Sequence, residues 1–204
     1  MGGWRPRRIV VVGTSGSGKT TMARRLAEVL SLPHVELDAL HWGPGWSPPP
    51  TEEFRARTAA AMAGEAWAMD GNYSQVRDIA WGRADTLVWL DYALPLVLWR
   101  VISRTVRRIV SREELWSGNR ESLRTAFLSR DSIILWAFTS YHRRREEYPR
   151  LFREPEYSHL RVVRLRHARA GRERQGNDRR EQEPHRLTSS QSSLRTKMSG
   201  QPFR

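Results

Sequence analysis

The chain has 204 residues and carries 35 Lys and Arg against 22 Asp and Glu, a formal net charge of +13. This length predicts one domain, with or without an appendage, and nine tryptophans with 39% hydrophobic residues exclude a chain that is disordered throughout. The absence of cysteine excludes disulfide frameworks, thiolate metal sites and cysteine nucleophiles.

The first half of the chain alternates between strand and helix patterns. The β-branched run 8–12 predicts a buried strand, and apolar residues at helical spacing predict a helix over 18–30. Residues 35–38 predict a second strand. The segment 41–50 holds two tryptophans, two glycines and four prolines, which predicts a loop, and Thr51 is a candidate N-cap for the next helix.

The second half continues this alternation. The apolar runs 67–70 and 86–91 predict strands that each end in an aspartate, and 161–165 predicts a fifth strand. Helices are predicted over 95–110 and 121–147, with a loop or lid between them. Five residues of the first of these helices are expected to face inward: Leu98, Val101, Ile102, Thr105 and Ile109. Strands that alternate with helices predict a parallel sheet covered on both faces.

The positive charge is concentrated at the end of the chain. Residues 161–204 hold 12 Lys and Arg against four acids, a net charge of +8, whereas the first 160 residues carry +5. Segment 168–204 has six apolar residues, too few to offset the entropy cost of ordering it. We therefore expect a folded domain over 1–167 and a disordered basic tail over 168–204. The charge predicts an anionic partner: a nucleotide, nucleic acid or a membrane surface.

Targeting signals and membrane spans are not predicted. The apolar run after Arg8 ends at Val12, whereas the apolar region of a signal peptide has about 7 to 15 residues. No segment approaches the roughly 20 apolar residues that span a bilayer. We expect a cytoplasmic protein with no membrane partner.

Residues 13–20 match the phosphate-loop pattern G-x-x-x-x-G-K-[ST], between a predicted strand and a predicted helix. Glycines let the backbone wrap so that its N–H groups point at phosphate oxygens. Lys19 would bind the β and γ phosphates, and the Thr20 hydroxyl would bind Mg²⁺. ATP and Mg²⁺ are therefore the expected cofactors. The expected cofactor-binding residues in this loop are Gly13, Ser15, Gly16, Ser17, Gly18, Lys19, Thr20 and Thr21.

Three aspartates end predicted strands at one edge of the sheet, where ligands of parallel sheets bind: Asp38, Asp70 and Asp91. The magnesium ion needs an anionic partner from a strand end, and the local pattern does not choose between Asp70 and Asp91. Each aspartate could instead cap the next turn, and this alternative is favoured for Asp91 but not for Asp38 or Asp70.

Aromatic residues and histidines accompany these aspartates. Trp42, Trp46 and Tyr73 are candidates for stacking on a planar substrate, although the sequence favours a role for each tryptophan as an anchor that holds the proline-rich loop to the core. His34 and His41 have no partner at metal-ligand spacing, so the sequence assigns neither of them a role.

Taken together, these motifs resemble the adenylate-kinase-related P-loop proteins. The matching stretches are 13–20, 37–42, 44–46, 70–73 and 84–91. More narrowly, and with 116–121 and 129–132 included, the chain is similar to the bacterial DNA-topology-modulation (FlaR-like) proteins. The resemblance covers about residues 8 to 166. It implies the α/β fold of nucleoside-monophosphate kinases: a P-loop NTPase with three α/β/α layers, a five-stranded parallel sheet in order 2-3-1-4-5, and a lid, here at about 111–130.

The resemblance also implies roles for individual residues. Asp70 corresponds to the aspartate of the Asp-Gly pair that ends strand three in adenylate kinases, which makes it the magnesium residue beside Thr20 and leaves Asp91 a supporting role. Arg100 and Arg104 are similar to the Arg-x-x-x-Arg that opens the lid, where the first arginine lies on adenine and the second contacts phosphate. Their spacing places both on one helix face, which a solvated basic surface would also show.

The chain departs from adenylate kinases in two places. Asn72 and Tyr73 occupy the stretch in which those enzymes carry an arginine that grips the substrate's phosphate. After His167 the chain does not resemble the family, and a polar, arginine-rich run stands where a C-terminal helix is expected.

The sequence thus favours a Mg²⁺-dependent phosphotransferase that acts on a small molecule such as a nucleoside or nucleotide. The acceptor would bind near Asp38, Trp42, Asp70, Asn72 and Tyr73, and Asp38 would accept the proton of its hydroxyl group. Lys19 and several arginines would neutralise charge in the transition state: Arg104, Arg112, Arg120, Arg124 and Arg130.

Two other functions stay open at this stage. One is a nucleic-acid-associated NTP-binding protein, which the basic tail allows although the chain shows no helix-turn-helix or RNA-binding signature. The other is a nucleotide-binding switch without small-molecule turnover.

Overall fold

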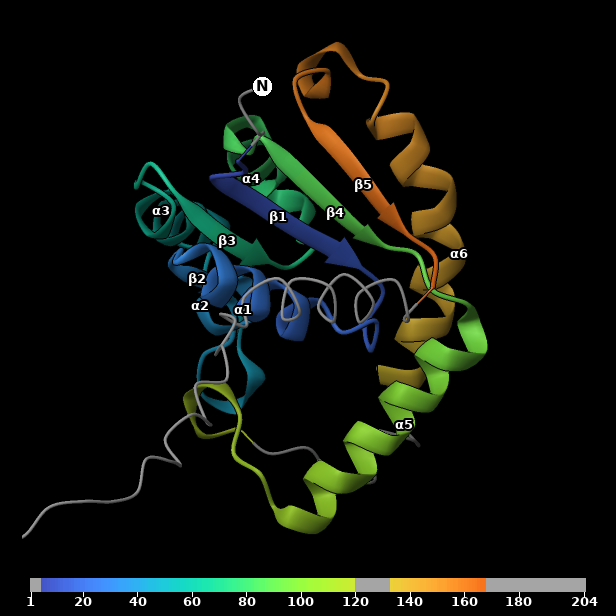
Figure 1. The fold of residues 1–204 in the computed structure, drawn as a ribbon. Helices are drawn as coiled ribbons and strands as arrows, with labels where there is room; N and C mark the ends of the chain where they lie inside the picture. The colour runs from blue at the N-terminus through green and yellow to red at the C-terminus, as the bar shows by residue number, and fades with distance from the viewer. Residues whose placement is uncertain (1–4, 120–132, 168–204) are drawn as a thin grey trace, which may run out of the picture. The chain divides into compact units, whose positions relative to one another are not determined.

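The protein is described by a computed structural model over residues 5–119 and 133–167. Its strands form one parallel sheet in the order β2-β3-β1-β4-β5, which confirms the expected fold class and strand order (Figure 1). The strands are β1 Arg8–Gly13, β2 His34–Glu36, β3 Trp67–Asp70, β4 Thr86–Leu90 and β5 Arg161–Leu165. The expected tail, residues 120–130 of the expected lid with Arg120, Arg124 and Arg130, and the start of the expected 121–147 helix lie outside the described residues.

Six α-helices are present in the part of the chain that the structure describes. They are α1 Lys19–Leu30, α2 Leu37–His41, α3 Thr51–Ala61, α4 Arg77–Arg83, α5 Leu94–Ser111 and α6 Ile133–Leu151. Short 3-10 turns join them: η1 Pro44–Trp46, η2 Ser74–Val76, η3 Trp116–Gly118 and η5 Pro155–Tyr157. None of the described helices is long and apolar enough to cross a membrane.

The sheet separates two hydrophobic cores because alternate residues of β1 point to opposite faces. Ile9 and Val11 face α1 and the first turn of α5, where they pack with Ala23, Ala27 and Val97. Val10 and Val12 face α3, α4 and α6, where their neighbours include Phe54, Trp81 and Tyr148. Burial on both faces explains why the strand is a continuous apolar run rather than an alternating one.

Three local expectations are wrong. The second strand ends at Glu36, and Asp38 lies in the first turn of α2, where a carboxylate suits the partial positive charge of a helix start. Thr51 is the first residue of α3 and Pro50 is its cap. Ile102 is 39% exposed, because the buried face of α5 is centred on Val97, Val101 and Thr105, the last two of which were expected there.

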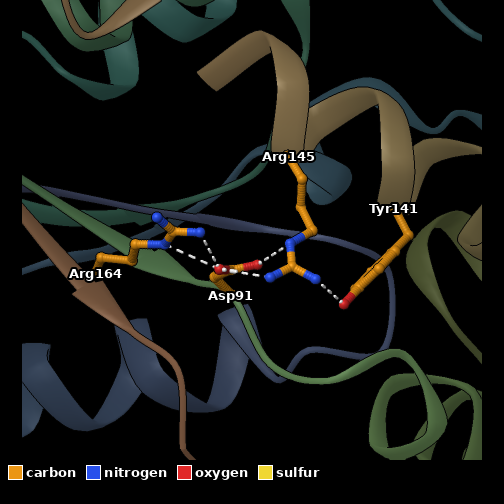
Figure 2. A network of polar contacts seen from close by, with 4 residues as sticks. All are labelled: Asp91, Tyr141, Arg145 and Arg164. Carbon is orange, nitrogen blue, oxygen red and sulfur yellow. Dashed lines mark hydrogen bonds and ion pairs between the residues drawn. The ribbon is translucent and has the colours of Figure 1, made fainter. Parts of the chain in front are cut away.

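Asp91 joins three elements immediately beyond the end of β4 (Figure 2). Its buried carboxylate accepts a hydrogen bond from Nε of Arg164 on β5 at 2.9 Å, and Nε of Arg145 on α6 lies 3.0 Å from its other oxygen. Arg145 also donates to the hydroxyl of Tyr141 at 2.6 Å, and the guanidinium of Arg164 lies over the Trp89 ring. Asp91 thus holds β4, β5 and α6 together.

Candidate active site

The phosphate loop connects β1 to α1, and α5 packs directly against it. Gly16 has a φ of +79°, and a Cβ there would lie 2.2 Å from Cγ2 of Val101 on α5, so only glycine fits. Gly18 precedes α1 with a φ of +91°. No side-chain hydrogen bond caps this helix and its first turn holds no acidic residue, so its first N–H groups are left for an anionic ligand.

The other loop residues lie around this turn. Gly13 ends β1, Ser15 is half-buried, Ser17 is buried, and Thr21 is exposed on the first turn of α1. Arg100 of α5 donates from Nη1 to the Ser17 carbonyl at 3.2 Å, and its guanidinium lies over the ring of Tyr92. The arginine expected to lie on adenine therefore already contacts the phosphate loop.

Lys19 lies inside the loop and donates to the Thr14 carbonyl at 3.3 Å. Burial and then the nearby Arg144 guanidinium lower its pKa from 10.5 to about 8, although Asp38 and Asp70 oppose this shift. Arg104, one turn beyond Arg100 on α5, also acts to lower the pKa of Lys19. A triphosphate would supply the negative charge that this cluster of cations lacks.

The lowered pKa predicts unusual reactivity of Lys19 in the nucleotide-free protein. A lysine with a pKa of about 8 presents half of its amine in the neutral, nucleophilic form at pH 8, whereas a free lysine side chain does so only near pH 10.4. Acylation of Lys19, followed by peptide mass spectrometry from pH 6 to 11, should be half-maximal near pH 8. Bound ATP should move that midpoint upward, because phosphates favour the protonated amine. A midpoint above pH 10 without nucleotide would contradict the expectation.

Thr20 and Asp70 meet at the start of α1. The Thr20 hydroxyl donates to Oδ2 of Asp70 at 2.6 Å, although the two residues are 50 positions apart in sequence. Asp70 ends β3 beside β1 and is almost fully buried. A hydroxyl and a carboxylate at the mouth of a phosphate loop are oxygen groups of the kind that bind Mg²⁺ alongside phosphates. The residues present therefore fit MgATP.

Two side chains that the sequence did not place on the phosphate loop converge on Gly13. Asn72 donates from Nδ2 to the Gly13 carbonyl and accepts from the Gly13 N–H at 3.4 Å. Arg144 of α6 donates to the same carbonyl at 3.1 Å, and burial lowers the pKa of its guanidinium. Sequence reasoning missed Arg144 because it lies in a run of three arginines that resembles a solvated basic face.

Asp38 lies in the first turn of α2. Tyr73 donates to its Oδ1 at 2.7 Å. Burial, and then the charge of Asp38, raise the pKa of Tyr73. The charge of Asp38 acts on both Lys19 and Arg144. Asp38 is therefore close enough to the phosphate-loop lysine for its charge to oppose the lowering of that lysine's pKa.

The aromatic side chains near Asp38 pack mainly on one another. His41 lies 4.3 Å from Tyr73 between ring centroids, Trp42 lies edge-on to Trp46, and Trp46 lies edge-on to Trp116. This packing agrees with the role of an anchor for the proline-rich loop.

The segment after α5 is attached to this same loop. Asn119 is buried, donates from Nδ2 to the Gly43 carbonyl at 2.9 Å and accepts from the Trp46 N–H at 3.1 Å. Ser117 donates to the Trp42 carbonyl at 2.8 Å. The first part of the expected lid therefore rests on the loop that follows Asp38, whereas Arg112 is exposed at the end of α5.

Replacing Asn119 with Ala should loosen this attachment. The change leaves the Gly43 carbonyl and the Trp46 N–H without their amide partner, at a cost of about 1–3 kcal/mol. Limited proteolysis between residues 112 and 119 should become several-fold faster. Ser103→Ala, at an exposed position of α5, is the control and should not change the rate. Equal rates for the two variants would show that Asn119 does not hold the segment.

Comparisons with known proteins find relatives by structure only. No protein-family model matches the chain, and a search of curated proteins gives no match. A gluconokinase from Sinorhizobium meliloti 1021 is 19% identical, covers 87% of this chain and 97% of its own, and has a TM-score of 0.46. A shikimate kinase from Acinetobacter baumannii in complex with shikimate is 17% identical, with coverage of 86% and 92% and a TM-score of 0.47. A sugar kinase from Janibacter sp. HTCC2649 is 19% identical, with coverage of 85% and 94% and a TM-score of 0.44.

At such identities and TM-scores, these neighbours do not identify an acceptor for this chain. The fold itself is that of P-loop nucleotide-binding proteins: a five-stranded parallel sheet with helices on both faces, in which the strand–phosphate loop–helix unit occupies the centre. The narrower resemblance to DNA-topology-modulation proteins receives no support from these comparisons.

Proposed function

We propose that this chain is a Mg²⁺-dependent phosphotransferase that transfers the γ-phosphoryl group of ATP to a hydroxyl group of a small molecule. The observation that carries this proposal is that the charge of Asp38, which Tyr73 holds by a hydrogen bond, acts on both Lys19 and Arg144 beside the phosphate loop. A carboxylate that faces the phosphate-binding cations is what activation of an acceptor hydroxyl requires.

The nucleotide would be held by the loop and its neighbours. Backbone N–H groups of residues 13–20 and the start of α1 would bind the phosphates, and Lys19 would turn from the Thr14 carbonyl toward the β and γ phosphates. Thr20 and Asp70 would hold Mg²⁺, which neutralises phosphate charge when bound. Arg100 would border the base and the loop together.

The acceptor would bind between Asp38 and the γ-phosphate. Tyr73 holds Oδ1 of Asp38, which would orient the carboxylate and leave Oδ2 to accept the proton of the acceptor hydroxyl. Trp42, Asp70 and Asn72 would border the same site. Asn72 serves it through Gly13, because its amide is bonded to that backbone.

Charge in the transition state would be neutralised mainly by side chains already at the loop. Arg144 and Lys19, which both bond carbonyls of the phosphate loop, would lie nearest to the γ-phosphate, and Arg104 would add a third positive charge from α5. In phosphoryl transfer, such positioning and electrostatic stabilisation supply most of the acceleration. We keep Arg112 and Arg120, with Arg124 and Arg130, as proposed lid arginines.

An acceptor screen tests this function. The full chain with MgATP is offered nucleosides, nucleoside monophosphates, sugars and sugar acids, and release of ADP is followed with each compound. We expect at least one hydroxyl compound to raise ADP release above the rate with water, and Lys19→Ala to abolish that increase. A panel without any acceptor-dependent ADP release would overturn the proposal.

The screen also separates the two rival functions. Acceleration of ATP turnover by DNA alone, with an affinity that falls steeply with salt, would favour a nucleic-acid-associated protein. Tight MgATP binding without turnover would favour a switch. We retain similarity to the DNA-topology-modulation group and a cytoplasmic location as proposals, supported by the sequence motifs, and no contact among the described residues favours nucleic acid as the partner.

A further inference from the structure

His34 makes a hydrogen bond to the proposed magnesium carboxylate that the proposed function does not use. Its Nε2 lies 2.8 Å from Oδ1 of Asp70, and the two side chains are 19% and 2% exposed. An ionised carboxylate only accepts hydrogen bonds, so Nε2 carries a proton and His34 is the donor. Asp70 is therefore held at both oxygens, by His34 at Oδ1 and by Thr20 at Oδ2.

This contact is not needed to join the two strands. β2 and β3 already pair through their backbones, with His34 opposite Ala68 and Glu36 opposite Asp70. The histidine side chain instead reaches diagonally past its own partner to the end of β3. The His34 side chain thus bonds the Asp70 carboxylate and takes no part in the backbone pairing of the two strands.

The surroundings of Asp70 explain what such a donor achieves. Glu36 lies beside it on β2, and burial and then the charge of Asp70 raise the pKa of Glu36. Two neighbouring carboxylates repel each other, and rotation of Asp70 would relieve this repulsion. A donor on Oδ1 opposes that rotation and keeps Oδ2 directed at the Thr20 hydroxyl.

We propose that His34 is a positioning residue for the magnesium site: it fixes Asp70, and through Asp70 the Thr20 hydroxyl, in the orientation that receives the metal ion of the nucleotide complex. Because the Thr20 hydroxyl donates its hydrogen bond to Asp70, the lone pairs of its oxygen face away from the carboxylate and are left for the metal ion. Partners of this kind, which orient metal ligands without touching the metal, typically change metal affinity 10- to 100-fold. The inference rests on the nucleotide-binding part of the proposed function and not on the transfer step.

The test compares two replacements at residue 34 with a control elsewhere. His34→Phe keeps an aromatic ring and removes the donor, whereas His34→Gln keeps an N–H at a similar reach. His159→Phe is the control, because His159 also makes a hydrogen bond through Nε2, to the Trp81 carbonyl, and contacts neither the loop nor Asp70. Mn²⁺ serves as the paramagnetic probe, and its affinity for the complex of the protein with a non-hydrolysable ATP analogue is measured by electron paramagnetic resonance.

We expect His34→Phe to weaken Mn²⁺ binding to that complex by about 10- to 100-fold. Affinity for the analogue in EDTA should stay within about twofold of the original chain, and His34→Gln should retain most of the Mn²⁺ affinity. The control should match the original chain in both measurements.

Three results would overturn the inference: unchanged Mn²⁺ affinity in His34→Phe, equal losses in the Phe and Gln variants, or an equal loss of analogue binding with and without metal. The last of these would show a purely structural role. Neither measurement requires an acceptor, so a protein that phosphorylates nothing would still confirm or refute the role of His34.

Discussion

Replacing Asp38 with Asn should lower kcat for phosphorylation of the acceptor by about 10²- to 10⁴-fold, the usual contribution of a general base. Asparagine keeps the shape of the side chain and its acceptor for the Tyr73 hydroxyl, but it cannot take the proton of the attacking group. ATP affinity should change little, because the phosphates are bound by the loop and Lys19. The measurement is steady-state kinetics with the best compound from the acceptor screen, together with calorimetry for ATP.

Two further variants separate proton transfer from simple binding. Tyr73→Phe removes the hydrogen bond that orients Asp38 and leaves the carboxylate in place, so its loss in kcat should be clearly smaller. Asp78→Asn, at an exposed position on α4, should leave both kcat and KM unchanged. If Asp38→Asn raised KM for the acceptor while kcat stayed constant, Asp38 would bind the acceptor and would not act as a base.

The sequence predicted those parts of the site that depend on neighbouring residues. The phosphate loop is a contiguous motif whose glycines, lysine and threonine are fixed by one turn of backbone, and it lies between the strand and helix that its pattern requires. The order of the strands was predicted from the resemblance to adenylate-kinase-related proteins. Hydrophobic runs locate strands in the sequence but do not show which strands lie side by side. Asp38 was predicted to end the second strand, but it lies in the helix α2 that follows that strand. The prediction missed this helix because α2 is too short to show helical periodicity.

The sequence pattern could not predict contacts between segments that are far apart in the chain. Arg143, Arg144 and Arg145 are consecutive on α6, where successive side chains point about 100° apart. One lies over the Trp136 ring, the next bonds the carbonyl of the phosphate loop, and the third bonds Asp91. Only the packing of α6 against the sheet decides which of the three faces the site. The pairing of His34 with Asp70 depends in the same way on the register of β2 and β3.

Replacing Asp91 with Ala should lower the free energy of unfolding by about 3 kcal/mol, the low end of the range for breaking a buried ion pair. The carboxylate is 1% exposed, and its removal leaves the guanidinium groups of Arg145 and Arg164 close together without the charge that they share (Figure 2). Their side chains are 43% and 33% exposed, so water compensates part of the loss. Urea unfolding followed by tryptophan fluorescence measures the change, and the slope of the transition should stay constant.

Asp78→Ala is the matched control for this effect, because Asp78 also accepts two hydrogen bonds from an arginine, Arg55, but does so on the surface. Screening by water and side-chain entropy make such exposed pairs weak, so the unfolding midpoint of Asp78→Ala should shift far less.

MgATP affinity separates a structural role of Asp91 from a role as metal ligand. If Asp91 acts only by joining β4, β5 and α6, then Asp91→Ala should bind MgATP normally under conditions in which it is folded. If the folded variant instead lost its Mg²⁺ dependence, Asp91 and not Asp70 would be the metal ligand.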